Sequence, residues 1–132
     1  MAKQVVFKGK EVLGKDFTIV DTHTNVKKVS NGMRAILEDL DKYEERQAKA
    51  KKPVTLMDYQ DIISDEVIVQ TGKLLGLSEE DTKKLENVSY SELFTFYSKA
   101  AEEFADMDIP SVDKIKESLQ ATNEVANEKD PK

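Results

Sequence analysis

Apolar side chains recur at intervals of three and four residues along most of the stretch from residue 25 to residue 105. This spacing places them on one face of an α-helix, because a helix completes a turn every 3.6 residues. With 132 residues and no cysteine, the chain has room for one domain that buries its own core without disulfides. We therefore expect a mainly α fold over residues 1–120, in which four to five helices follow a short β-hairpin-like segment.

The β-hairpin-like segment covers residues 3–21. Residues 5–7 and 17–20 are rich in β-branched and aromatic side chains, and the glycines between them are typical of turns. Two short strands are marginally stable alone, and an unpaired strand edge is a template for pairing. The sequence leaves open whether these strands pair with each other or with another chain.

Two long helices are bounded by clear stop and start signals. The first covers residues 25–51 and ends before Pro53, which disfavours a helical residue at the preceding position. Gly32 weakens its middle by about 1 kcal/mol relative to alanine. Thr55 is the predicted N-cap of the second helix, and Gly76 is its predicted C-cap.

Two shorter helices follow. Ser78 opens a helix that extends to about residue 86, with Leu85 facing inward. Ser89 and Glu92 have the spacing of a capping box for a helix over residues 90–105, whose aromatic stripe predicts the centre of the core. A weak fifth helix would begin at Ser111, and residues 121–132 have little to bury, which predicts a disordered tail.

Charge is unevenly distributed along the chain, whose net charge is −6. Residues 1–56 hold 12 Lys and Arg against 8 Asp and Glu, whereas residues 57–108 hold 4 against 13. This asymmetry favours contact between unlike ends of neighbouring copies, although the charges can also simply solvate helix faces. An acidic chain disfavours nucleic-acid binding, and no apolar run is long enough to span a membrane.

No residue pattern in the sequence indicates catalysis. His23 is the only histidine, so triads and multi-histidine metal sites are excluded. Gly72 and Lys73 do not form a phosphate loop, because Leu74 stands where that loop needs a hydroxyl group. The acidic pairs lie at helix starts or on polar faces, where the helix dipole explains them. We expect no catalytic, cofactor-binding or metal-binding residues, and a protein that is not an enzyme.

The order of these elements resembles the tail assembly chaperones of long-tailed, siphovirus-type phages that infect Gram-positive bacteria. The resemblance rests on the β-like start, the long first helix, and the residues 61–78, DIISDEVIVQTGKLLGLS, and 88–94, VSYSELF. It implies a chaperone in the host cytoplasm that binds the tape measure protein, a long apolar helical chain, and keeps it soluble during tail morphogenesis. It also implies self-association around that partner, in an open spiral, with no cofactor.

On this resemblance, the partner would be bound by apolar stripes on two helices, unless those stripes form the buried core. The candidate partner-binding residues are Tyr59, Ile63, Val67, Leu74, Leu93, Phe94, Tyr97 and Phe104. The candidate self-association residues, which would face the acidic part of the next copy, are Lys8, Lys10, Lys27, Lys28 and Arg34.

Two other functions fit the composition. A small acidic helical regulator would bind a transcription factor or another DNA-binding protein at its nucleic-acid site, and would be a discrete monomer or dimer. A small enzyme would need a ligand pocket lined by carboxyl groups with displaced pKa values.

Overall fold

The structure is a computed structural model of the chain, and it describes residues 3–109. The predicted mainly α fold with an N-terminal hairpin is confirmed, while the expected fifth helix and the tail at residues 121–132 lie outside the described residues. The elements in order are β1 (Gln4–Phe7), α1 (Lys10–Leu13), β2 (Phe17–Val20), α2 (His23–Ala50), α3 (Leu56–Leu75), α4 (Glu79–Lys84), the 3-10 turn η1 (Leu85–Asn87) and α5 (Tyr90–Ala105).

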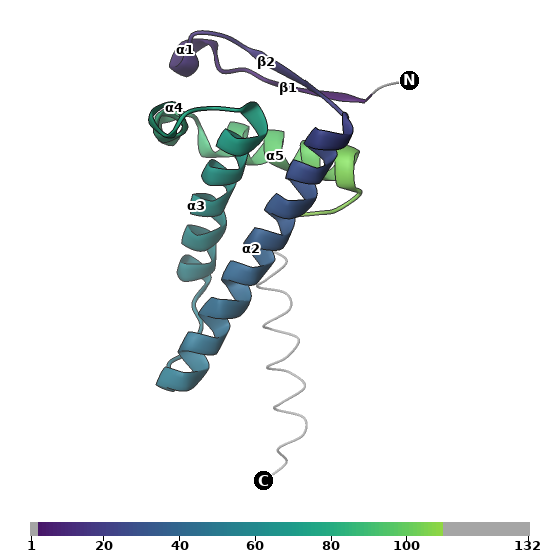
Figure 1. The fold of residues 1–132 in the computed structure, drawn as a ribbon. Helices are drawn as coiled ribbons and strands as arrows, with labels where there is room; N and C mark the ends of the chain where they lie inside the picture. The colour runs from purple at the N-terminus through teal and green to yellow at the C-terminus, as the bar shows by residue number, and fades with distance from the viewer. Residues whose placement is uncertain (1–2, 110–132) are drawn as a thin grey trace.

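The two long helices, α2 and α3, lie side by side in opposite directions, and α5 crosses both of them near one end of the pair (Figure 1). The hairpin of β1 and β2 lies across that same end, where β1 contacts α5. The core therefore sits where α2, α3, α5 and β1 meet. Within residues 3–109, no helix combines the length and the apolar content that crossing a bilayer requires.

The predicted ends of the long helices are confirmed. Thr55 Oγ1 accepts a hydrogen bond from the Asp58 N–H at 3.1 Å, which caps the start of α3. Gly76 ends α3 in the left-handed conformation at φ 71°, a region that glycine enters without steric cost. The chain leaves α2 through Lys51, which is also left-handed at φ 57°, two residues before Pro53.

Two tyrosines join α2 to α3 in a reciprocal way. The Tyr43 hydroxyl of α2 donates to Asp58 Oδ2 at 2.7 Å and accepts from the Thr55 N–H at 2.9 Å. The Tyr59 hydroxyl of α3 donates to Glu44 Oε1 of α2 at 2.8 Å, and the two rings meet edge to face at 5.2 Å. Burial, together with the hydrogen bond to Glu44, raises the pKa of the Tyr59 phenol. This pair fixes the end of the α2–α3 hairpin that α5 does not cover.

Replacing Tyr43 by phenylalanine is expected to lower the free energy of unfolding by about 2 kcal/mol, because the change removes two hydrogen bonds, one of them to a carboxylate. Tyr59→Phe is the matched control, because it removes only one hydrogen bond, to the exposed side chain of Glu44. It is expected to lower the free energy of unfolding by about half as much. Urea unfolding of both variants measures the difference. Equal losses of unfolding free energy in the two variants would show that the hydrogen bond from the Thr55 N–H to the Tyr43 hydroxyl does not stabilise the fold.

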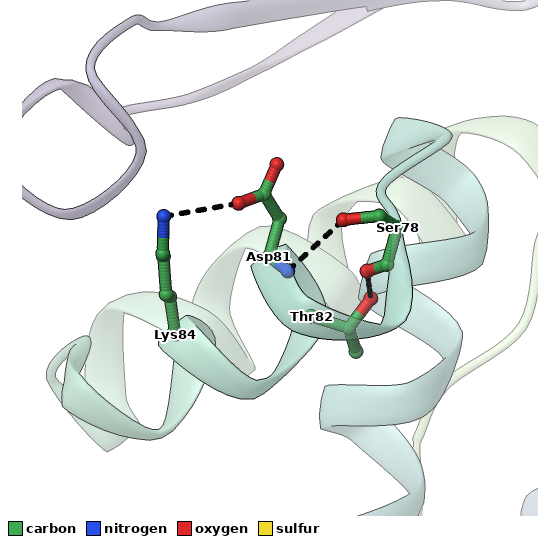
Figure 2. A network of polar contacts seen from close by, with 4 residues as sticks. All are labelled: Ser78, Asp81, Thr82 and Lys84. Atoms are coloured by element: carbon green, nitrogen blue, oxygen red, sulfur yellow. Dashed lines mark hydrogen bonds and ion pairs between the residues drawn. The ribbon is translucent and has the colours of Figure 1, made fainter.

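The short helix α4 is held by local polar contacts (Figure 2). Ser78 Oγ accepts from the Asp81 N–H at 3.1 Å, and the Thr82 hydroxyl donates to the Ser78 carbonyl oxygen at 2.8 Å. The ion pair between Asp81 and Lys84, at 3.1 Å, is solvent-exposed and contributes little. Gly72 is a close-packing point, because a Cβ atom at that position would overlap the Thr82 side chain.

The two strands pair with each other within the chain, antiparallel, with Val5 opposite Ile19 and Phe7 opposite Phe17. Between them the chain forms α1, a single helical turn, which ends at Gly14 with φ 84°. The ring of Phe7 meets Phe96 of α5 edge to face at 5.1 Å. This aromatic contact attaches β1 to α5, and α1 between the strands makes a smaller contact with α4.

Candidate functional site

Among residues 3–109, no group of three or more His, Cys, Asp or Glu side chains is arranged to hold a metal ion. His23 is exposed at the start of α2. Other features of the described residues that can bind another molecule include a groove beside β1, a smaller mixed-charge concavity between α2 and α3, and several exposed apolar side chains.

The structure buries seven of the eight candidate partner-binding residues. Each of the seven is at most 7% exposed, as part of the core formed by α3 and α5. In this conformation they offer no surface to a partner, because a helix packed on two neighbours turns its apolar stripe inward. A partner-binding role for them stays a prediction that requires the core to open. The seven are Tyr59, Ile63, Val67, Leu74, Leu93, Tyr97 and Phe104.

Phe94, the eighth candidate, is half-buried and stacks on Tyr90 with the ring centroids 5.7 Å apart. Tyr90 is 42% exposed, and burial of part of its ring raises the pKa of its phenol. These two aromatic rings are the accessible part of the α5 stripe.

The sequence did not single out most of the apolar side chains that the structure exposes. Met57 at the start of α3 is 77% exposed, and each of the others is between 36% and 49% exposed. Leu37, Val69 and Tyr90 fall within the apolar spacing of their helices, so the spacing alone does not show that they stay exposed. Besides Met57 they are Val6, Val20, Leu37, Val69 and Tyr90.

The five candidate self-association residues lie in two places. Lys8 follows β1 and Lys10 begins α1, whereas Lys27, Lys28 and Arg34 lie in the first half of α2. Four are exposed and Lys28 is half-buried. All five are therefore accessible to another copy, and their role in self-association stays a prediction.

A groove of about 640 Å³ runs between β1 and the first half of α5. Phe96, which is 6% exposed, belongs to its floor beside Phe7, and the amino groups of Lys8 and Lys99 contribute positive charge. The lining is thus apolar at the base, with hydroxyl and charged groups around it. The lining residues are Gln4, Val6, Phe7, Lys8, Ser91, Glu92, Thr95, Phe96 and Lys99.

The outer edge of β1 faces this groove with free backbone groups. The Asp21 N–H donates to the Lys3 carbonyl oxygen at 3.0 Å, so this pair is hydrogen-bonded. Because bonded and non-bonded pairs alternate along antiparallel strands, Val5 and Phe7 bond to β2, and Gln4 and Val6 direct their N–H and C=O groups outward. Unpaired groups of this kind are the attachment points for an added strand.

A second concavity, of about 190 Å³, lies between α2 and α3, where Glu66 meets Asp39. Burial raises the pKa of the Glu66 carboxyl, and the hydrogen bond to Asp39 raises it further, whereas Gln70 and Lys73 act in the opposite direction. Gln70 Nε2 donates to Glu66 Oε1 at 2.6 Å. The lining contains no hydroxyl, thiol or imidazole group. The other lining residues are Lys42, Arg46, Ile62 and Asp65.

The raised pKa of Glu66 makes stability depend on pH with a definite sign. The folded state holds the Glu66 proton more tightly than the unfolded state, so this group stabilises the fold at acid pH and loses that contribution as the pH rises through the folded-state pKa. Glu66→Gln keeps an acceptor for Gln70 without the charge. We expect the free energy of unfolding of this variant at neutral pH to exceed that of the parent by up to about 1 kcal/mol. The gain is small because solvent screens charges at this partly exposed site.

Urea unfolding at about pH 5 and about pH 7.5 checks this expectation. The advantage of the glutamine variant should be smaller at the lower pH, and Glu45→Gln on the exposed face of α2 is the control for loss of a charge. A variant that is less stable than the parent at neutral pH would contradict the expectation.

No protein-family model matches the chain, and neither a curated protein nor a solved structure matches it.

Proposed function

We propose that the protein is a phage tail assembly chaperone, without catalytic activity, that binds the tape measure protein and self-associates around it. The observation that carries the proposal is the groove beside β1, where a free strand edge lies over an apolar floor with lysines near it. Such a site suits the attachment of a further polypeptide rather than a small substrate. The sequence resemblance supplies the identity of the partner.

Contact with a long apolar helix would use side chains that the fold leaves exposed. Met57 at one end of α3, Leu37 on α2 and Tyr90 with Phe94 on α5 are accessible without any change in the core. They are scattered over three helices, so one copy offers a small apolar area to any single segment of the partner. Many copies along the partner would add these areas together, which is why self-association belongs to the proposal.

Co-expression with a fragment of a tape measure protein tests the proposal. We expect the fragment to be mostly insoluble alone and several-fold more soluble with the chaperone. The variant carrying Met57→Ser and Tyr90→Ser should lose most of this gain, because it removes apolar surface outside the core. Gln60→Ser with Glu102→Ser, two exposed polar positions on the same helices, is the matched control. A fragment that stays insoluble with the unmodified protein would contradict the proposal.

A small acidic regulator is the second candidate, and the acidic face of α3 favours it. Asp58, Asp61 and Asp65 lie along the first half of this helix, in the part of the chain that carries most of the negative charge. A regulator would bind a basic protein in a complex of fixed stoichiometry and would have no effect on an apolar helical chain.

A further inference from the structure

We propose that copies of this chain join head to tail through their hairpins, with the β2 edge of one copy pairing with the β1 edge of the next, inside the groove over α5. This inference rests on the self-association in the proposed function, and it names the surfaces that carry it.

The groove has room and hydrogen-bonding groups for one more strand. The outward N–H and C=O groups of Gln4 and Val6 form no hydrogen bond with any other group in residues 3–109 outside the hairpin. Val6 itself is 49% exposed, and Phe96 lies beside it at the base of the groove. An added strand would therefore complete a backbone ladder and cover apolar surface at once.

The β2 strand has apolar side chains that its own chain covers only in part. The inward side chains of β1, Val5 and Phe7, are 1% and 2% exposed, whereas their partners on β2, Ile19 and Phe17, are only half-buried. The hairpin thus overhangs the helices on its β2 side. When β2 enters the groove of the next copy, the half-exposed faces of Phe17 and Ile19 meet the α5 surface around Phe96.

Charge at the strand ends favours this pairing over pairing between two β1 strands. A lysine flanks β1 on each side, at Lys3 and Lys8, and an aspartate flanks β2 on each side, at Asp16 and Asp21. Antiparallel pairing of two β1 strands through their outward groups, with Val6 opposite Val6, would set Lys8 against Gln4, so neither lysine would gain an acidic partner. Pairing β1 with β2 of another copy sets lysine against aspartate at both ends.

The backbone of the hairpin fits the same register. Within one chain Val6 lies opposite Thr18, and by the alternation along the strands this is the pair that does not exchange hydrogen bonds. Both residues direct their backbone groups outward, so Val6 of one copy and Thr18 of the next can exchange two bonds. The ladder ends at Val20, whose carbonyl oxygen accepts from Asn25 Nδ2 at 2.9 Å.

The contact joins two different surfaces, so it leaves a free β1 edge at one end of any assembly and a free β2 edge at the other. A heterologous contact of this kind grows into a ring or an open helical filament. An open filament has the geometry to follow a long partner.

Two proline variants test the contact. Val6→Pro removes the outward N–H of β1, and Thr18→Pro removes the outward N–H of β2, while the hydrogen bonds inside the hairpin keep their donors. Analytical ultracentrifugation of the full chain should show concentration-dependent assemblies for the parent and monomers for each variant. An equimolar mixture of the two variants should form a species of twice the monomer mass and nothing larger, since each variant keeps one intact surface.

Three results would overturn the proposal: a monomeric parent over the whole concentration range, association that persists in either variant alone, or no dimer in the mixture. If a proline variant fails to fold by circular dichroism, charge reversal replaces it. Lys8→Asp and Asp16→Lys should each weaken association, and the chain carrying both should recover it. The solubility test with the tape measure fragment is independent of this contact. If a monomeric protein keeps the fragment soluble, the hairpin contact is contradicted but the chaperone function is not.

Discussion

Replacing Phe7 by alanine is expected to lower the free energy of unfolding by about 3–5 kcal/mol, the usual cost of truncating a buried aromatic side chain. Phe7 is 2% exposed and meets Phe96 edge to face at 5.1 Å. The change removes the contact that attaches the hairpin to α5 and leaves a cavity at the base of the groove. Assembly should be lost together with stability, because β1 then no longer lies beside α5.

Phe17→Ala is the matched control, since Phe17 lies opposite Phe7 on β2 but is only half-buried. It should cost about 1 kcal/mol, in proportion to the smaller area that it removes from water. Urea unfolding followed by circular dichroism measures both variants. Similar losses at the two positions would contradict the view that only the β1 side of the hairpin is seated on the helices.

Replacing Gly32 by valine is expected to lower the free energy of unfolding by roughly 3 kcal/mol, at the upper end of the cost of overpacking a core. Gly32 lies where α2 passes the fully buried Tyr97 of α5, and even a single Cβ atom there would overlap the Tyr97 hydroxyl. It would also lie 2.9 Å from Gln70 Oε1. The helices would have to move apart at the centre of the core.

A double-mutant cycle with alanine separates this clash from helix propensity. Tyr97→Phe alone should be close to neutral, because the buried hydroxyl has no hydrogen-bond partner in the described part of the chain. Gly32→Ala alone should be destabilising, and the two changes together should recover the parent stability or exceed it by about 1 kcal/mol, the propensity gain of alanine over glycine. Additive effects in thermal unfolding would show that Gly32 and Tyr97 do not touch.

The helices were predictable because their signals are local. Thr55, Gly76 and Ser78 stand at the positions where they were expected, and the caps at Thr55 and Ser78 form through contacts within three residues. The capping box at Ser89 was wrong in its chemistry. The Ser89 side chain makes no cap bond, and its Oγ lies 3.0 Å from Ser91 Oγ, although α5 still begins at Tyr90.

The hairpin region could be predicted only in part from local sequence signals. Turn residues were expected near Gly9 and Gly14, but the single turn α1 between them was not, because four residues carry no periodicity. The groove could not be predicted either, since it exists only where Phe7 and Phe96, far apart in sequence, meet. Periodicity located the apolar stripes of α3 and α5 and predicted that the α5 stripe lies at the centre of the core, which is confirmed, but it did not reveal which apolar side chains stay exposed.

The number of copies bound per tape measure fragment tests the central claim most directly. We would measure the mass of the complex by analytical ultracentrifugation with two fragments, one twice as long as the other, at about 0.05 M salt, where charge contacts are least screened. A chaperone that assembles along its partner predicts that the longer fragment binds twice as many copies. The same small number of copies on both fragments would contradict the account and favour the acidic regulator.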